Sequence, residues 1–266
     1  MRLSPRTACQ TTIIALLSLG ALGGCASRGE QDGENDPFRP TNRTIFSGNL
    51  FLDRHALRPV ARAYADDVPH GVRGGIHNFL SNLDAPVILI NDLAQGNVSR
   101  GWNTTERFVI NTTVGGLGVF EVADGWGMPY HNADFGQTLG VWGVSPGPDV
   151  QLPLFGFSNL RDAGGRVVDA FLNPLSVASA GTSNAAIVAL NVTKSGLGMV
   201  DGRARMLPVT DQVERNSLDE YATLTSLYSQ NRTAFVKDGK AGFVQPEAAR
   251  IMARNAAIGQ TGNGAD

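Results

Sequence analysis

The chain has 266 residues, with 22 Lys and Arg against 24 Asp and Glu and a formal net charge of −2 at pH 7. Nucleic acid is therefore not an expected partner, because binding to phosphate backbones requires an excess of basic side chains. Charged residues make up only 17% of the chain, against a typical share of about 25%, and the 32 glycines are unusually many, so the composition suits a chain partly embedded in an apolar medium.

The first predicted element, residues 1–24, is a lipoprotein signal peptide. Arg2 and Arg6 precede an apolar run that is too short to span a bilayer, and the segment ends in Leu22-Gly23-Gly24-Cys25. We expect cleavage before Cys25 and acylation of this cysteine, which would anchor the chain to a membrane. A plain secretory signal is the alternative.

The residue after the lipidation site bears on location. Ala26 stands where an aspartate would favour retention at the inner membrane of many bacteria, so the periplasmic face of the bacterial outer membrane is predicted. Cys9 lies in the signal, and Cys25 is expected to be lipidated. No cysteine would then remain for a disulfide, a thiolate metal site or a nucleophile.

The rest of the chain divides into three parts. Residues 25–36 comprise the lipidated cysteine and an acidic, flexible tether, residues 37–238 a helical domain, and residues 239–266 a polar tail expected to be disordered. No uninterrupted apolar stretch beyond the signal approaches the length of a transmembrane helix. If the body enters a bilayer, it does so with amphipathic helices.

Apolar residues recur at helical spacing along this body. The pattern predicts two or three helices over residues 42–83, then a helix that Asp84 caps and that ends at Gly96, with Pro69 and Pro86 near helix starts. Further helices are expected around residues 102–110, 160–172, 183–194 and 217–235. The glycine-rich middle, which begins at Gly115-Gly116-Leu117-Gly118, predicts loops and short helices that either pack under their neighbours or face lipid.

No motif indicates an enzyme. Gly143-Val144-Ser145-Pro146-Gly147 matches the nucleophile elbow of lipases, but the oxyanion hole of that fold uses the N–H of the residue after the serine, and Pro146 has none. The last histidine is His131, so no histidine follows Ser145 to complete the triad. The four histidines have no metal-ligand spacing and no nucleotide-binding loop is present, so no metal or cofactor is expected.

The order and spacing of many small motifs resemble the MlaA (VacJ) family of outer-membrane lipoproteins, from about Asp36 to Pro174. The motifs are Asn35-Asp36-Pro37-Phe38, Asn42-Arg43, Arg58-Pro59-Val60-Ala61, Asn82-Leu83, Arg107-Phe108, Asn111-Thr112-Thr113, Asp134 to Gly140, Leu152-Pro153 and Leu160-Arg161-Asp162.

This resemblance implies an all-α, ring-like protein that lies in one leaflet of the outer membrane around an amphipathic central channel. Such a protein removes mislocalised phospholipids from the outer leaflet and passes them to the periplasmic carrier MlaC, beside a trimeric porin. The competing interpretation is a structural envelope lipoprotein that tethers or supports a porin and moves no lipid.

Within this frame we hypothesise which residues border the passage. Apolar residues of the glycine-rich segment would meet acyl chains, and charged residues would offer partners near headgroups. Equally, these residues could only hold the ring together. The candidates are Gly115, Gly116, Leu117, Gly118, Val119, Phe120, Asp134, Phe135, Gly136, Arg161 and Asp162.

Overall fold

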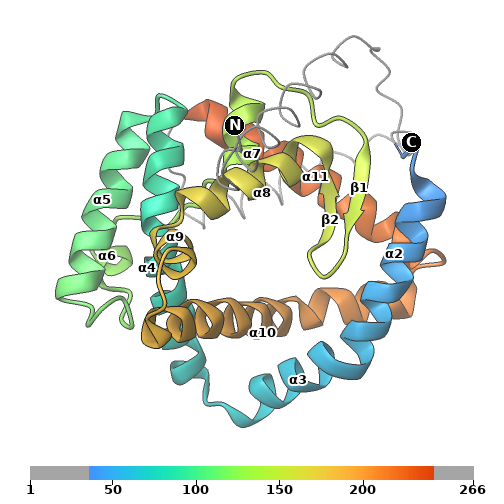
Figure 1. The fold of residues 1–266 in the computed structure, drawn as a ribbon, viewed down its shortest axis with the longest axis horizontal. Helices are drawn as coiled ribbons and strands as arrows, with labels where there is room; N and C mark the ends of the chain where they lie inside the picture. Colours follow the sequence, from blue (N-terminus) through green and yellow to red (C-terminus); the bar gives the residue numbers. More distant parts are fainter. Residues whose placement is uncertain (1–35, 243–266) are drawn as a thin grey trace, which may run out of the picture. The chain divides into compact units, whose positions relative to one another are not determined.

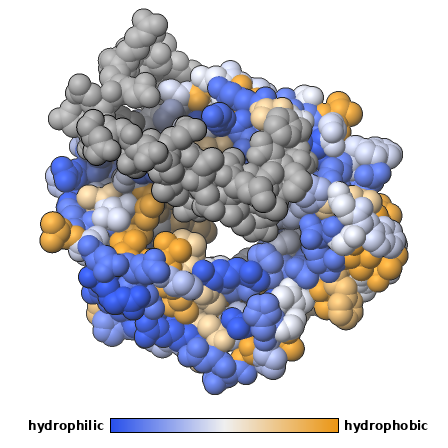
Figure 2. All heavy atoms as spheres, turned by 180° about the vertical axis from the view of Figure 1, so that it is seen from behind, coloured by the Kyte–Doolittle hydropathy of each residue, from blue (hydrophilic) through white to orange (hydrophobic). Residues whose placement is uncertain are grey.

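The computed structural model describes residues 36–242, so the predicted signal peptide, Cys25, most of the tether and most of the tail lie outside the described residues. This part of the chain is mostly helical, with one small hairpin of two strands. Its helices follow one another around a central opening (Figure 1). The space-filling view from behind shows the opening as a gap through the molecule (Figure 2).

Three helical elements run end to end along one side of the ring: α2 (Arg39–Leu52), the π-helical turn η2 (Asp53–Leu57) and α3 (Arg58–Asp67). The N–H of Arg58 bonds to the carbonyl of Asp53, five residues back. Pro59 follows directly and has no N–H to donate, so the wider π turn lets the chain pass the proline without ending the helix.

The opposite side is an antiparallel pair, α4 (His70–Ala94) and α5 (Val98–Thr113). The prediction that Asp84 begins a new helix is wrong, because α4 continues through Asp84 and Pro86. A proline inside a helix costs one hydrogen bond, and packing against α5 compensates for it. Near the connection between the two helices, a Cβ on Gly101 would lie 3.2 Å from the Leu93 side chain, so glycine lets the helices approach closely there.

The middle of the chain holds two short helices, α6 (Val122–Gly125) and α7 (Phe135–Val141), and a hairpin that the sequence did not predict. Strands β1 (Asp149–Leu152) and β2 (Gly156–Asn159) pair antiparallel, with Asp149 opposite Asn159. Four residues per strand are too few for an alternating pattern to stand out. The all-α expectation is therefore corrected to mostly helical.

Asparagine side chains of α2 hold this hairpin in place. The Asn42 amide donates to the carbonyl of Asp149 (2.9 Å) and accepts from the N–H of Gln151 (2.9 Å). About two helical turns later, Asn49 makes the same pair of bonds to the carbonyl of Leu152 and the N–H of Leu154. The two amides thus satisfy main-chain groups at the strand edge that would otherwise lack partners.

The ring closes through α8 (Leu160–Leu172), α9 (Pro174–Ala180), α10 (Ala185–Asn216) and α11 (Glu220–Ala241). Helix α10 is far longer than the predicted 183–194. Its glycines and Pro208 weaken the sequence pattern, but ion pairs to the opposite helices hold it, such as Arg203 to Asp53 (2.6 Å) and Arg58 to Glu214 (2.6 Å). Helix α11 also extends past residue 239, where the tail was predicted to begin.

Across residues 36–242, no helix combines the length and the apolar character that crossing a membrane would require.

Candidate functional site

The glycine-rich segment Gly115–Phe120 connects α5 to α6 and lies against the N-terminal half of α4. The side chain of Asn78 donates to the carbonyl of Val119 (3.3 Å), and that of Asn82 donates to the carbonyl of Leu117 (3.4 Å). Leu117 and Phe120 are 65% and 67% exposed. The segment therefore packs on α4 and still presents apolar side chains outward; their contact with acyl chains stays a prediction.

Two glycines of this segment adopt backbone conformations that other residues rarely take. Gly118 has φ of +91°, and a Cβ there would lie 2.4 Å from the Cβ of Asn82. Gly116 has φ of +60° with its nearest neighbour, the Phe120 ring, at 3.9 Å. Glycine is thus favoured at position 118 both by conformation and by close packing, and at position 116 by conformation alone.

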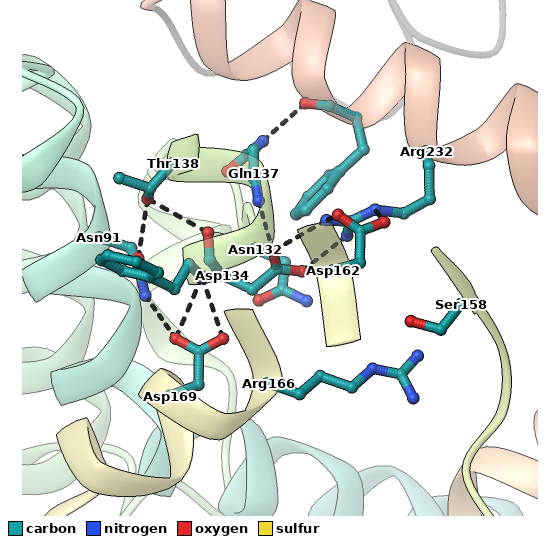
Figure 3. A network of polar contacts seen from close by, with 12 residues as sticks. Asn91, Asn132, Asp134, Gln137, Thr138, Ser158, Asp162, Arg166, Asp169 and Arg232 are labelled. Carbon is teal, nitrogen blue, oxygen red and sulfur yellow. Dashed lines mark hydrogen bonds and ion pairs between the residues drawn. The ribbon is translucent and has the colours of Figure 1, made fainter. Parts of the chain in front are cut away.

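Asp134 and Asp162, by contrast, are brought together by an arginine that the sequence did not single out (Figure 3). Arg232 of α11 donates to both carboxylate oxygens of Asp134, at 2.7 and 3.0 Å, and to Oδ1 of Asp162 at 3.0 Å. Its Nε lies 2.8 Å from Oδ2 of Asp162, in ion-pair contact but without hydrogen-bond geometry.

The two carboxylates also organise the starts of their helices. Asp134 is the N-cap of α7 and accepts from the N–H of Gln137 (2.7 Å), while Asp162 lies in the first turn of α8. A carboxylate is favourable at both places because helix N-termini carry partial positive charge. Through Arg232 this cluster joins α7, α8 and α11.

Arg161 and Asp162 are almost fully buried. Arg161 donates to Oδ1 of Asp162 (2.9 Å), and the hydroxyl of Tyr228 and the amide of Asn159 donate to Oδ2. Burial alone would raise the pKa of Asp162, but the charge of Arg232 and these hydrogen bonds hold it below its ordinary value. So many partners leave Asp162 little capacity for a ligand, which favours its role in holding the ring together.

Phe135 and Gly136 lie where α7 meets α8. The N–H of Phe135 donates to both carboxylate oxygens of Asp169, at 3.1 and 3.0 Å. A Cβ on Gly165 would lie 2.3 Å from the backbone nitrogen of Gly136. The main chains of α7 and α8 are thus in direct contact, which only glycine at position 165 allows.

A hydrogen-bonded chain continues from Asp169 into α4. The amide of the fully buried Asn91 donates to Asp169 (2.9 Å) and accepts from the hydroxyl of Thr138 (2.8 Å) (Figure 3). Burial raises the pKa of Asp169, against the opposing effect of the bonds from Phe135 and Asn91.

The next residue of α4, Asp92, is the centre of a second buried polar cluster. Its carboxylate accepts from Arg100 (3.3 Å) and Thr104 (2.7 Å) and lies 2.8 Å from Nε2 of His131. The sequence analysis missed this cluster. An aspartate inside the apolar pattern of α4 was the available signal, since a buried charge requires partners.

The segments joined by these clusters line a pocket of about 270 Å³ between α4, α8 and α9. These three helices border the opening in Figure 1. We call it the inner pocket. Charged and apolar side chains share its wall, and it includes the predicted site residue Asp134. Its lining residues are Asp84, Val87, Ile88, Asn132, Ala133, Asp134, Arg166, Asp169, Ala170, Asn173 and Ser176.

Arg166 connects the inner pocket with the hairpin. Its guanidinium donates to the carbonyls of Phe155 (3.2 Å) and Phe157 (3.3 Å). Figure 3 shows the side chain extending from α8 toward Ser158 on the hairpin.

Many large apolar side chains are exposed at the surface, although much of the interior is polar. Orange patches of hydrophobic residues interrupt the blue surface in Figure 2. The exposed apolar side chains come from most of the helices and include Phe51, Val60, Leu93, Trp102, Val109, Trp142, Phe171 and Val192. Large apolar patches on a surface mark contact with a membrane or another protein.

The residues weighed as catalytic or metal-binding lie apart from one another. Ser145 lies between α7 and β1, and the next residue is Pro146, while His131 is buried against Asp92. Within residues 36–242, no group of three or more acidic, histidine or cysteine side chains could hold a metal ion.

The fold and the site define a mostly helical protein with buried charged clusters and an apolar exterior. Residues 34–235 match the family described as MlaA lipoprotein, well beyond Pro174, where the sequence resemblance was expected to end. The chain belongs to the MlaA lipoprotein family.

Individual relatives agree with this. The chain is 36% identical over 241 residues, 88% of its length and 91% of the relative's, to "Intermembrane phospholipid transport system lipoprotein MlaA" of Escherichia coli (strain K12). The protein of the same name from Haemophilus influenzae is 33% identical over 238 residues, 87% of this chain and 92% of the relative. A solved structure described as "Structural basis for maintenance of bacterial outer membrane lipid asymmetry" superposes with a TM-score of 0.64 at 35% identity, covering 76% of this chain and 98% of that one.

Proposed function

We propose that this chain is a phospholipid-transport lipoprotein of the bacterial outer membrane. Anchored through Cys25 and its apolar outer surface, it takes mislocalised phospholipids from the outer leaflet and releases them to a periplasmic carrier of the MlaC kind. The observation that carries the proposal is a ring of helices with an apolar exterior around an opening that has charged and apolar residues at its edge.

The apolar exterior supports residence in a single leaflet. Side chains such as Trp102, Val109 and Phe171 are 65%, 52% and 74% exposed, and each would gain from leaving water. Burying apolar surface contributes roughly 25 cal/mol per Å². Amphipathic helices that lie in the plane of a membrane bind it in this way without spanning it.

The edge of the opening supports passage of an amphiphile. A phospholipid crosses a bilayer slowly because its charged headgroup must leave water for hydrocarbon, at a cost of several kcal/mol or more. The inner pocket places Arg166 and Asp169 beside Val87 and Ile88, so polar and apolar parts of a lipid would each find partners there. Such a path lowers the barrier to headgroup movement.

Movement through the opening is passive in this proposal. The sequence has no phosphate-binding loop, so the chain has no evident means of using ATP. Direction then comes from the carrier that removes lipid on the periplasmic side. A trimeric porin beside the ring is the proposed neighbour in the membrane, covering part of the apolar exterior.

The proposal predicts that the protein purified in a mild, lipid-free detergent retains phospholipid. Extraction into organic solvent followed by mass spectrometry should find about one phospholipid or more per chain, above the amount retained by an unrelated outer-membrane lipoprotein purified in parallel. A phospholipid content equal to that of the unrelated protein would instead favour a structural lipoprotein that supports a porin and moves no lipid.

A further inference from the structure

A second pocket, of about 520 Å³, is lined by Arg161 and Arg232, whereas Asp134, an ion-pair partner of Arg232, lines the inner pocket. One face of α11 forms a wall of it, with Ser229, Arg232, Val236 and Lys240 at helical spacing of three or four residues. The loop after α7 and the first turn of α8 form the remaining wall. We call this the basic pocket; its volume is in the usual range for ligand sites, about 300–1,000 Å³.

Four cations line the basic pocket: Arg161, Arg232, Lys237 and Lys240. The two arginines are held in place by carboxylates behind them, Arg161 by Asp162 and Arg232 by Asp162 and Asp134. Among the ion pairs formed within residues 36–242, none involves Lys237 or Lys240. Two lysines one turn apart on a helix repel each other unless an anion lies between them.

One carboxylate, that of Asp149, also lines the basic pocket. Asp149 is half-buried, and burial together with the neighbouring Asp36 raises its pKa to about 6. Protonation of Asp149 in mildly acidic solution weakens its repulsion of a bound anion. When Asp149 is ionised, the two lysine charges still outnumber its single negative charge. Ser145 and Ser229 add hydroxyl groups to the wall.

We infer that the basic pocket binds a phosphate-bearing anion, coordinated by Lys237 and Lys240 beside the guanidinium groups of Arg161 and Arg232, whose charges Asp134 and Asp162 already balance. Lysine, arginine and hydroxyl groups together are the donors that phosphate oxygens accept best. Since no ion pair among residues 36–242 involves Lys237 or Lys240, their charges favour an anion over a cation in the pocket. The phosphate can belong to a lipid headgroup, an assignment that rests on the proposed function, or to free phosphate.

The test is a calorimetric titration of the full-length lipidated protein in an uncharged detergent. The probes are inorganic phosphate, dihexanoyl-phosphatidylglycerol below its micelle concentration, and glycerol as a control without phosphate. The double variant Lys237→Gln with Lys240→Gln removes both lysine charges and leaves the Arg232 cluster intact. Arg215→Gln is the matched control, because Arg215 is exposed on α10 and does not line the pocket.

The parent should bind at least one phosphate probe saturably, and the double variant should bind it about tenfold more weakly or worse, as expected when charged hydrogen bonds are lost. Arg215→Gln should bind like the parent. Tighter binding of the lipid probe assigns the pocket to a headgroup, and binding of inorganic phosphate alone assigns it to free phosphate.

Absence of saturable binding to the parent, equal affinity of the double variant, or equal binding of glycerol would overturn the inference. These outcomes are distinct from failure of the proposed function. A protein without bound phospholipid that still binds phosphate through Lys237 and Lys240 would contradict the transport role and leave the pocket assignment standing.

Discussion

Replacing Arg232 with methionine should lower the free energy of unfolding by about 3 kcal/mol, as is typical when one partner of a buried ion pair is removed. Methionine keeps much of the side-chain volume but leaves Asp134 without an ion-pair partner and Asp162 with Arg161 alone. The loss of stability is large because the Asp162 side chain is only 4% exposed, so water cannot replace the contacts that Arg232 made. Denaturant titration followed by circular dichroism measures the change.

The loss of stability caused by Arg232→Met should depend on pH. The pKa of Asp162 in the folded protein lies below its ordinary value, so its ion pairs contribute stability above the ordinary aspartate range, and this stability is lost as the pH falls through the folded-state pKa. The difference in free energy of unfolding between the parent and Arg232→Met should therefore be largest near pH 7 and should shrink below about pH 4.

Two further variants separate the ion pair from a general effect of substitution. Arg215→Met removes an exposed arginine with no ion pair among residues 36–242, and it should be nearly neutral. Adding Asp134→Asn to Arg232→Met should recover part of the loss, since one uncompensated charge disappears. Equal destabilisation by Arg232→Met and Arg215→Met would refute the assigned role of Arg232.

Replacing Gly165 with alanine should destabilise the fold by about 2–3 kcal/mol, the upper part of the range for overpacking. The added Cβ would lie 2.3 Å from the backbone nitrogen and 2.7 Å from the Cα of Gly136. These are main-chain atoms, so no side chain can rotate away and α7 and α8 must separate. Separation would also lengthen the bonds from Phe135 to Asp169.

Gly164 provides a neighbouring control in the same helix. A Cβ there meets no atom within 4 Å, so Gly164→Ala should stabilise α8 by about 0.5–1 kcal/mol through helix propensity. The midpoints of thermal unfolding of the two variants should therefore move in opposite directions. A similar shift for both would mean that α7 and α8 do not approach as closely as described.

Local sequence patterns predicted the helical class and many of the helices, because apolar periodicity and turn residues act over short distances. Asp134 and Asp162 were identified as polar site residues, and their proximity is evident only in the fold. Arg232 escaped detection because it lies 70 residues from Asp162 along the chain and belongs to an amphipathic helix in which an arginine is unremarkable.

The failures of prediction arise where distant contacts decide the local structure. The hairpin Asp149–Asn159 has strands too short to produce a pattern, and it is stabilised by Asn42 and Asn49, more than 100 residues away. Pro86 was expected near a helix start and the helix of residues 183–194 was expected to end well before Pro208, but tertiary packing and ion pairs sustain α4 and α10 through these prolines. Sequence cannot weigh a local penalty against contacts whose partners are distant.

The central claim is that amphiphiles pass through the opening of this helical ring. It is tested most directly by deleting the gene in its own bacterium and measuring the phospholipid in the outer leaflet that an added phospholipase can reach. We expect this phospholipid to accumulate, and to return to its normal level with the intact chain but not with Cys25→Ser, which lacks the predicted anchor. Unchanged outer-leaflet phospholipid in the deletion strain would contradict the account.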